Sequence, residues 1–356
     1  MHKKLFIPGP VEVRPEVLMR MATPMIGHRS KAASELQHGI SDKLKTLFGT
    51  REAILLSTSS GSGLMEGAVR SCTAQRAACF AVGAFGVRWY DMAVGNGVPA
   101  DLFEVPWGEP NTAQQLEAAL ASGKYDLITI THNETSTGLM NPLGELSAVW
   151  KRYPEVVVCA DTVSSMGGTP IPVDEWGIDI CVTSTQKALG LPPGLAICSF
   201  SQKAVERAKT VKQRGYYLDL LALYDYIQKK DYQYPSTPSL SHMFALDYQL
   251  DLILAEGLKE RYARHRAMAE LVRAWAAKHF ALFADPACLS DTLTTITNTR
   301  DIDVAALNKA LGERGWQISN GYGKLKDKTF RIAHMADAAV DEIKALLADI
   351  DDILSL

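Results

Sequence analysis

A lysine inside a glycine- and proline-rich turn is the residue of this chain best suited to covalent chemistry. Lys187 lies in the segment Ser184-Thr185-Gln186-Lys187-Ala188-Leu189-Gly190, directly after an apolar run at residues 178–182 that predicts a buried strand. An amine removed from water gives up its proton more readily and becomes a nucleophile, as Schiff-base lysines do. An ordinary solvated lysine in a surface loop is the alternative when this residue is taken alone.

A carboxylate at the end of another apolar run gives this lysine a chemical partner. Asp161 ends the segment Val156-Val157-Val158-Cys159-Ala160-Asp161, which predicts a second buried strand. Pyridoxal phosphate requires such a pair, because a lysine holds its aldehyde and an aspartate keeps its ring nitrogen protonated. The two residues therefore predict a pyridoxal phosphate site in which Lys187 and Asp161 are catalytic.

A serine- and glycine-rich turn between a strand and a helix indicates where a phosphate would bind. Residues 57–63 follow the apolar run at 53–56 and precede a helical segment that begins Leu64-Met65-Glu66. The N–H groups at a helix start have no partners within the helix, and the helix dipole favours negative charge there. Most turns of this composition are only connectors. The nucleotide-binding Walker and Rossmann fingerprints are both absent, which argues against a nucleotide in this loop.

The elements that must position these residues form a repeating pattern. Apolar runs that predict strands lie at residues 53–56, 78–82, 125–130, 156–160, 178–182 and 195–200. They alternate with helical segments, which predicts a mostly parallel sheet whose sites gather at the carboxyl ends of the strands. The serine-glycine turn, Phe85, Thr135, Asp161 and Lys187 all follow predicted strands. One pocket can therefore hold all of them.

Asp161-Thr162-Val163-Ser164-Ser165-Met166-Gly167-Gly168, followed by the lysine segment, resembles the class V aminotransferases, which are fold-type I pyridoxal phosphate enzymes. The resemblance runs from Pro8-Gly9-Pro10 to Arg331-Ile332-Ala333-His334, and the alanine/serine–glyoxylate (or pyruvate) aminotransferases are the most similar branch. It implies an α/β fold with a large domain, built on a mostly parallel central sheet flanked by helices, and a smaller α+β C-terminal domain. The implied boundaries are an N-terminal arm at residues 1–15, a large domain at 16–256 and a small domain at 257–356.

The resemblance also implies roles for individual residues. Phe85 would stack on the cofactor ring where the family often has tryptophan, and Arg331 would bind the substrate carboxylate through two parallel hydrogen bonds. Tyr234 and Thr237 would reach the cofactor phosphate of the other subunit in a homodimer with shared sites. The full set of implied cofactor-binding residues is Ser62, Gly63, Leu64, Phe85, Thr135, Asp161, Gln186, Lys187, Tyr234 and Thr237.

Together these motifs imply an aminotransferase that moves an amino group from alanine or serine to glyoxylate or pyruvate. Arg331 accounts for one carboxylate, and a donor with a second anionic group would need another fixed cation, because burying an unpaired charge is costly. The candidate cations are His28, Arg29 and Lys324, and none lies in a motif for side-chain recognition. Aspartate or 2-aminoethylphosphonate is the alternative donor.

Two other functions stay open. A cysteine desulfurase needs a reactive cysteine in the C-terminal part, where Cys288 is the candidate, but no adjacent basic residue lowers its pKa. A regulatory protein that has kept only the fold is the other alternative. The intact Asp161, Lys187 and Arg331 argue against it.

Composition excludes several further classes. The chain has 356 residues, 47% of them apolar, and a net charge of −3 without a basic stripe, so we expect a sizeable core and no nucleic-acid partner. No apolar run is long enough to span a bilayer, and Pro8 comes too early for a signal-peptide core. The six cysteines form no CxxC pair and the eight histidines are scattered, so we expect no metal site and a reducing, cytoplasmic location.

Overall fold

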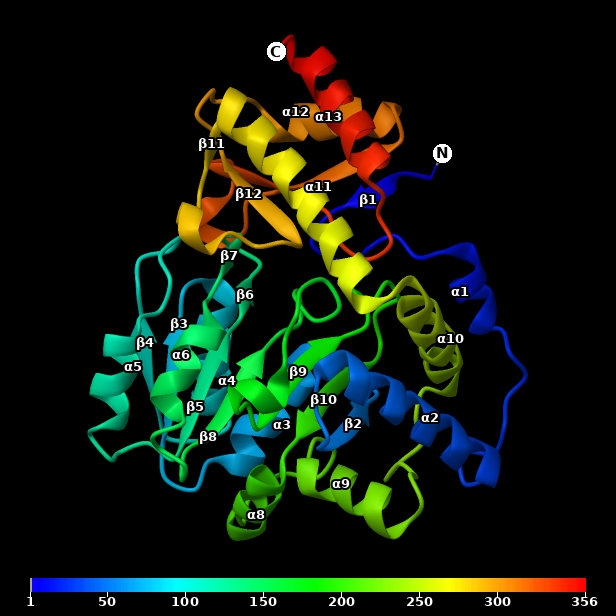
Figure 1. Cartoon of the computed structure of the whole chain (residues 1–356), viewed down its shortest axis with the longest axis vertical. Helices are drawn as coiled ribbons and strands as arrows, with labels where there is room; N and C mark the ends of the chain where they lie inside the picture. Colours follow the sequence, from blue (N-terminus) through cyan, green and yellow to red (C-terminus); the bar gives the residue numbers. More distant parts are fainter. Residues whose placement is uncertain (1) are drawn as a thin grey trace.

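Two β-sheets organise the chain in the computed structural model, which describes residues 2–356 (Figure 1). The larger sheet has seven strands, and only one of them, between Ala196 and Phe200, runs antiparallel to its neighbours. In spatial order the strands are β2 (Ala53–Ser57), β10 (Ala196–Phe200), β9 (Ile180–Ser184), β8 (Val157–Asp161), β5 (Leu127–Thr131), β3 (Ala77–Ala81) and β4 (Ala100–Glu104).

Helices cover both faces of this sheet because side chains alternate between the faces along each strand. In β8, Val158 and Ala160 pack on one face, whereas Val157 and Cys159 pack on the other. The first face is covered by α1 (Pro15–Arg20), α2 (Lys31–Phe48), α5 (Ala113–Leu120), α6 (Leu143–Trp150), α7 (Val173–Trp176) and α10 (Leu240–Glu256). The second is covered by α3 (Gly61–Cys72), α4 (Ala84–Gly95), α8 (Gln202–Thr210) and α9 (Leu220–Lys229).

A smaller five-stranded sheet joins the two ends of the chain at the top of Figure 1. Its spatial order is β1 (Lys4–Phe6), β13 (Trp316–Asn320), β14 (Thr329–Ala333), β12 (Leu293–Thr297) and β11 (Ala281–Leu282). Its separate apolar core is closed by α11 (Leu258–His279), α12 (Val304–Glu313) and α13 (Val340–Leu354). The remaining elements are the hairpin β6 (Asn133–Glu134) and β7 (Leu139–Met140) and the short helices η1 (Pro286–Cys288) and η2 (Gly323–Leu325).

The predicted architecture is confirmed, because the structure has a mostly parallel, helix-flanked sheet and a smaller α+β part. The apolar runs predicted as strands at 53–56, 78–82, 125–130, 156–160, 178–182 and 195–200 correspond, in that order, to β2, β3, β5, β8, β9 and β10. Sequence reasoning missed β4, β13, α8 and α9. The strands β4 and β13 are largely half-exposed, so they lack the continuous apolar run that marks a buried strand.

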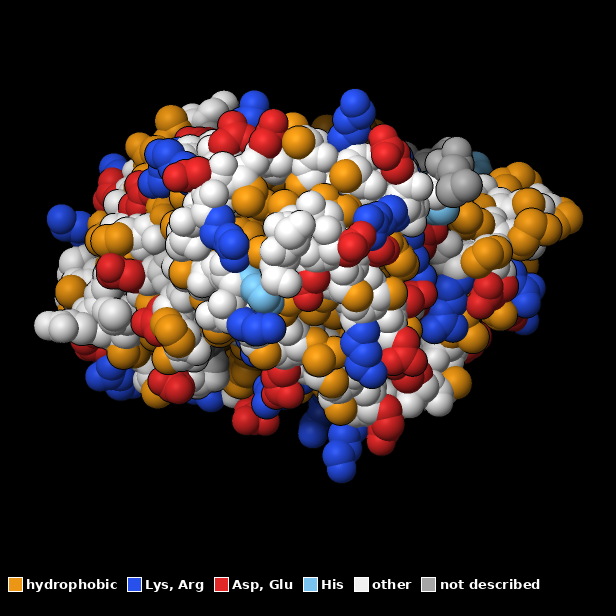
Figure 2. All heavy atoms as spheres, turned by 90° about the horizontal axis from the view of Figure 1, so that it is seen from above, with side chains coloured by type: hydrophobic (Ala, Val, Ile, Leu, Met, Phe, Trp, Pro, Cys, Tyr) orange, Lys and Arg blue, Asp and Glu red, His pale blue; other side chains and the backbone are white. Residues whose placement is uncertain are grey.

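The surface and the helices add two observations. Figure 2 shows basic and acidic side chains interspersed over the face seen from above, as the small net charge leads one to expect. Among residues 2–356, every helix is too short or too polar to cross a membrane, and no three His, Cys, Asp or Glu side chains gather as metal ligands would.

Candidate active site

A cavity of about 300 Å³ opens where strands of the large sheet end. Six residues that the sequence predicts for the site line it: Ser62, Phe85, Thr135, Asp161, Gln186 and Lys187. They come from the starts of α3 and α4, from the last residue of β8 and from the segments that follow β6 and β9. The other lining residues are Ser60, Gly61, Met65, Arg88, Val163 and Ser184. The folded chain thus brings most of the predicted site together.

The two predicted catalytic residues have opposite shifts in pKa. Burial raises the pKa of Asp161 to about 7, and the nearby Glu134 adds to this rise. A hydrogen bond of 2.8 Å from the Val163 N–H and the charge of Lys187 both lower the pKa of Asp161 and so oppose the rise. Burial lowers the pKa of Lys187 to about 8, against the attraction of Asp161 and with help from Arg331 and Arg88. A considerable share of the Lys187 amine is therefore unprotonated near neutral pH.

The start of α3 forms one end of the cavity. Ser60 is the N-cap, and the cavity touches Ser60, Gly61 and Ser62. A Cβ on Gly61 would lie only 2.7 Å from Cγ2 of Val163, so glycine is required for the close packing here. The predicted contacts Gly63 and Leu64 do not line the cavity: the Gly63 N–H donates to the Ser60 carbonyl at 2.8 Å, and Leu64 is fully buried in the core. The helix therefore contacts the cavity through Ser60 to Ser62, which lie earlier in the chain than the predicted Ser62 to Leu64.

Two polar atoms in the cavity wall show that the site is built for a polar ligand. The Ser184 hydroxyl and Oε1 of Gln186 are buried, and neither has a hydrogen-bond partner within residues 2–356. Buried polar atoms are nearly always satisfied, so these two call for a ligand. A helix start for a phosphate, a buried carboxylate and a lysine of lowered pKa complete a donor set that fits pyridoxal phosphate.

Arg88 is a cavity residue that the sequence analysis missed. Its guanidinium lies 4.5 Å from the centre of the Phe85 ring and donates hydrogen bonds of 3.3 Å to the Ser62 hydroxyl and to the Tyr322 hydroxyl. The Tyr322 ring in turn lies 5.2 Å from the Phe85 ring. The three-residue spacing of Phe85 and Arg88 places both on one helix face, which is a signal that could have found Arg88. Tyr322 comes from the loop that follows β13 of the small sheet and carries no comparable signal.

Glu134 is a second missed residue, and it positions Phe85. Its fully buried carboxylate accepts hydrogen bonds from the Phe85 N–H at 3.1 Å, the Gly86 N–H at 3.0 Å and the Ser136 hydroxyl at 2.6 Å. A carboxylate at a helix start satisfies N–H groups that have no partner in the helix. Glu134 thereby fixes the first turn of α4 and the aromatic wall of the cavity.

Arg331 approaches the cavity from the small sheet. It lies on β14 and is 7% exposed, and burial lowers its pKa to about 10, a value at which it still carries a full charge at neutral pH. Its Nη1 donates to the carbonyl of the cavity residue Thr135 at 3.0 Å, and its Nε donates to the Asn320 carbonyl at 3.1 Å. Two hydrogen bonds to backbone thus hold the guanidinium beside the cavity.

The residues predicted to act across subunits lie outside the cavity. Tyr234 is buried, and its hydroxyl accepts a hydrogen bond of 3.1 Å from the Thr58 N–H of its own chain, next to the start of α3. Thr237 is exposed. Their contact with a partner's phosphate stays a prediction.

The other candidate residues from the sequence are also absent from the cavity lining. Among the three candidate cations, the exposed Arg29 donates to the backbone carbonyl of Pro235 at 3.2 Å, and Lys324 lies 3.9 Å from the Trp107 ring. His28 likewise does not line the cavity. Burial and the charge of Asp285 raise the pKa of Cys288, which disfavours the thiolate that a desulfurase needs.

Comparison with known proteins identifies the family. Residues 25–337 match the family described as aminotransferase class-V. The chain is 34% identical to the alanine–glyoxylate aminotransferase of Oryctolagus cuniculus, over 96% of this chain and 89% of the relative. It is 32% identical to the L-aspartate–glyoxylate aminotransferase of Paracoccus denitrificans, over 93% of this chain and 86% of the relative.

A solved structure agrees with these matches. The alanine–glyoxylate aminotransferase of a Nostoc species superposes with a TM-score of 0.93 and 27% identity, over 99% of this chain and 96% of that chain. The family match covers far more than half of the chain, and it agrees with the cavity chemistry. The chain therefore belongs to the class V aminotransferases and is a pyridoxal phosphate-dependent transaminase.

Proposed function

We propose that this transaminase transfers the amino group of alanine or serine to glyoxylate or pyruvate. The observation that carries the proposal is the guanidinium of Arg331, held beside the cavity by the carbonyls of Thr135 and Asn320. It suits the one carboxylate that every α-amino acid and α-oxo acid shares. Apart from Arg88, Asp161 and Lys187, the residues that line the cavity are uncharged, which suits a small neutral substrate. The two curated relatives named above are aminotransferases that act on glyoxylate.

The proposed roles of the site residues follow from their surroundings. When bound, pyridoxal phosphate supplies a ring that withdraws electrons from the α-carbon of the amino acid. Asp161 holds a proton at the ring nitrogen, and Lys187 holds the cofactor and moves the α-proton through its amine. Phe85 lines the cavity and would provide the aromatic wall for the ring. The helix start at Ser60 to Ser62 would bind the phosphate, in place of the predicted contacts Gly63 and Leu64.

Aspartate is the second candidate donor, and Arg88 is the observation that favours it. Arg88 is a cation in the cavity wall, and its hydrogen bonds there go to the neutral hydroxyls of Ser62 and Tyr322. We assign its charge to the cofactor phosphate because Ser62 belongs to the helix start that suits an anion. If the Tyr322 side of Arg88 instead faces the substrate, the second carboxylate of aspartate or the phosphonate of 2-aminoethylphosphonate would bind there.

Half-reactions without an acceptor test the choice between these donors. The enzyme is mixed separately with alanine, serine, aspartate and 2-aminoethylphosphonate, and conversion of the cofactor to its amine form is followed by absorbance. We expect alanine or serine to react fastest, and Arg88→Gln to weaken cofactor binding without changing the order of donors. Fastest conversion by aspartate or the phosphonate, lost selectively in Arg88→Gln, would replace the first candidate by the second.

We further propose the three-part division into an arm at residues 1–15, a large domain at 16–256 and a small domain at 257–356. The separate apolar cores of the two sheets support it, although β1 of the arm belongs to the small sheet. A closing movement of the small domain would change the distance between Arg331 and Lys187.

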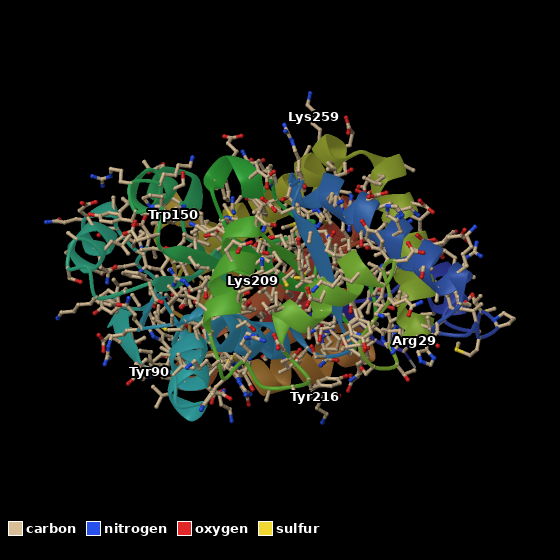
Figure 3. The ribbon with its side chains drawn as sticks, turned by 90° about the horizontal axis from the view of Figure 1, so that it is seen from below. Arg29, Tyr90, Trp150, Lys209, Tyr216 and Lys259 are labelled. Carbon is tan, nitrogen blue, oxygen red and sulfur yellow. The ribbon has the colours of Figure 1, made fainter. Side chains whose placement is uncertain are left out.

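We propose that the working unit is a cytoplasmic homodimer with shared sites. Tyr216 is 95% exposed and Tyr217 is 50% exposed. Tyr216 and Arg29 both lie on the underside of the molecule (Figure 3). Arg29 donates a hydrogen bond to the Tyr234 carbonyl and so holds the loop that contains Tyr234. Exposed aromatic side chains next to this loop support a contact with a second copy. The cysteines are all unpaired and five are buried, which supports a reducing compartment.

A further inference from the structure

The turn Pro8-Gly9-Pro10 lies directly against the catalytic lysine. The Lys187 Nζ donates a hydrogen bond to the carbonyl of Pro8, which is buried, and the Val11 N–H donates to the Gln186 carbonyl at 3.3 Å. Gly9 has a positive φ of 97°, and a Cβ there would lie 2.7 Å from Cδ of Lys187 and 2.9 Å from the Gln186 carbonyl oxygen. Glycine at this position thus allows the arm to approach the lysine closely.

The Pro8 carbonyl and the guanidinium of Arg331 are both positioned by strands of the small sheet. Pro8 lies two residues after β1, and β1 pairs in parallel with β13 through Lys4 opposite Trp316 and Phe6 opposite Ile318. The neighbouring strand β14 carries Arg331, which is opposite Ser319 of β13. The relative positions of the Pro8 carbonyl and the Arg331 guanidinium are therefore set by the small sheet. Lys187 instead follows a strand of the large sheet.

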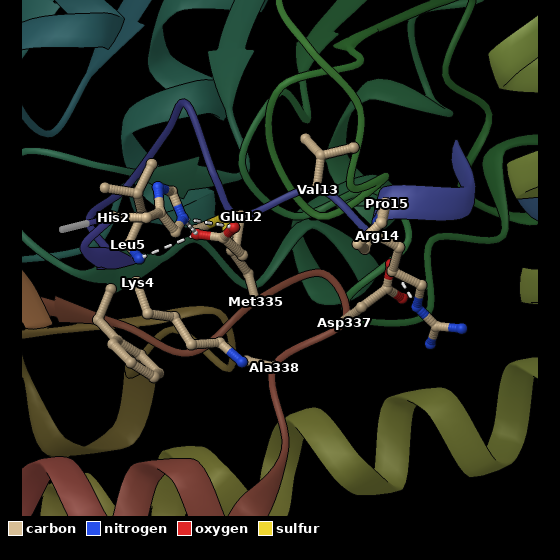
Figure 4. A pocket seen from close by; sticks show the side chains of 11 residues that line it. His2, Lys4, Leu5, Glu12, Val13, Arg14, Pro15, Met335, Asp337 and Ala338 are labelled. Carbon is tan, nitrogen blue, oxygen red and sulfur yellow. Dashed lines mark hydrogen bonds and ion pairs between the residues drawn. The ribbon is translucent and has the colours of Figure 1, made fainter. Parts of the chain in front are cut away.

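Apolar packing of Phe6 and Val11 and several polar contacts hold the rest of the arm. A cavity of about 280 Å³ separates it from Met335, Asp337 and Ala338 (Figure 4). Arg14 pairs with Asp337 at 3.1 Å, and Lys4 pairs with Glu342 of α13. Because side chains do not fill this space, the arm has room on this side to adjust when Gly9 is changed.

We propose that the Pro8 carbonyl positions the free amine of Lys187 during turnover. This rests on the proposed role of Lys187 as the carrier of the α-proton. When Nζ takes up that proton it becomes an ammonium group with three N–H donors, and one of them donates to the Pro8 carbonyl. When Nζ releases the proton, the amine returns to its neutral state, so the carbonyl orients the lysine but neither gains nor loses a proton. Pro8 is thus a positioning residue that acts through Lys187.

The test displaces the carbonyl with Gly9→Ala and uses Gly97→Ala as a matched control. Gly97 also has a positive φ, of 70°, but an added Cβ would meet nothing within 4 Å, so this variant carries the backbone strain alone. In cofactor-free protein, the pH midpoint for chemical labelling of Lys187 reports on its ammonium form. Loss of a hydrogen bond to a charged group should lower this midpoint by about one pH unit or more in Gly9→Ala. Gly97→Ala should match the wild type.

Kinetics of the loaded enzyme provide the second readout. In Gly9→Ala we expect kcat to fall at least about 10-fold, and the isotope effect with α-deuterated alanine to rise, because proton transfer becomes slower than the other steps. The KM for the donor should change little, since Arg331 is not altered. An unchanged labelling midpoint with an unchanged isotope effect in folded Gly9→Ala would overturn the proposal.

A second variant covers the case in which Gly9→Ala does not fold. Glu342→Ala removes the pairing partner of Lys4 and loosens the arm from outside the site, so the labelling midpoint should move in the same direction by a smaller amount. If this folded variant left the midpoint at the wild-type value, the proposal would be overturned in that case too. The labelling experiment needs no substrate, so a wrong choice of amino donor would leave its outcome unaffected.

Discussion

The pKa of Lys187 leads to a prediction in which two substitutions have opposite effects. Burial lowers this pKa from an ordinary value of 10.5 to about 8. At pH 7.4 the neutral fraction of the amine is then about 20%, against less than about 0.1% for an ordinary lysine, a difference of roughly 200-fold. Asp161 raises the pKa of Lys187 and Arg331 lowers it, so removing either charge should change this pKa.

The perturbations are Asp161→Asn and Arg331→Gln, which remove one charge each; the first keeps the side-chain size and the second shortens the side chain. Asp161→Asn should lower the labelling midpoint of Lys187 from about 8, because the ammonium form loses its attractive partner. Arg331→Gln should raise it, because a repelling charge is gone. Nearby charges shift a pKa by about 1–3 units when they lie close and buried, and we expect the lower end of this range for each variant.

The assay is pulsed reductive methylation of the cofactor-free protein between about pH 6 and 11, with the modified peptides quantified by mass spectrometry. Lys31, whose side chain is 85% exposed, serves as the internal reference for the activity of the reagent. A wild-type midpoint near 10.5 would refute the argument from burial. Movement of both variants in the same direction would refute the assignment of opposing charges.

The remaining predictions concern the cofactor, stability and subunits. Lys187→Ala should abolish turnover and the visible absorbance of lysine-bound cofactor while still allowing non-covalent binding, and wild-type turnover in this variant would show that another residue does the chemistry. The raised pKa of Asp161 means that the folded, cofactor-free state binds more protons than the unfolded state between about pH 4 and 7. Its stability should therefore fall as pH rises from about 4 through 7, by at most roughly 4 kcal/mol. Urea unfolding of wild type and Asp161→Asn at pH 5 and pH 8 measures this, and equal pH dependence in the two proteins would contradict it. In mixed dimers of Lys187→Ala with a Tyr234→Phe, Thr237→Ala double mutant, one site should carry both defects and the other neither. Heterodimers without any recovered activity would count against shared sites.

The strand-end residues were predictable from sequence because a parallel sheet leaves little choice about where its sites form. Asp161, Lys187 and Thr135 follow apolar runs, and the structure places all three at the cavity. The cavity contacts the start of α3 at Ser60 to Ser62, whereas the sequence predicts contacts from Ser62 to Leu64, and this difference has a physical reason. Only the first residues of a helix direct unpaired N–H groups outward, and by its fourth residue α3 has turned its side chain into the core.

The missed residues depend on contacts between distant segments. Glu134 follows the β5 strand run, but its partners are backbone N–H groups of α4, which no side-chain pattern in the sequence reveals. Tyr322 reaches the cavity wall through a loop of the small sheet. The Pro8 carbonyl reaches Lys187 because β1 pairs with β13, and a strand of only three residues is too short to show a periodicity.

The pairing of β1 with β13 also has a consequence for how the protein is made. β1 leaves the ribosome first, but its partner strand begins only at Trp316. At about 5–20 residues per second, the arm waits on the order of tens of seconds for that strand. Throughout this time the growing chain can complete the strands that deliver Asp161 and Lys187, while Pro8 and Arg331 have no sheet to hold them. The wall of the site that carries Pro8 and Arg331 is therefore the last to assemble, and a chain that ends before β13 would contain Lys187 without it.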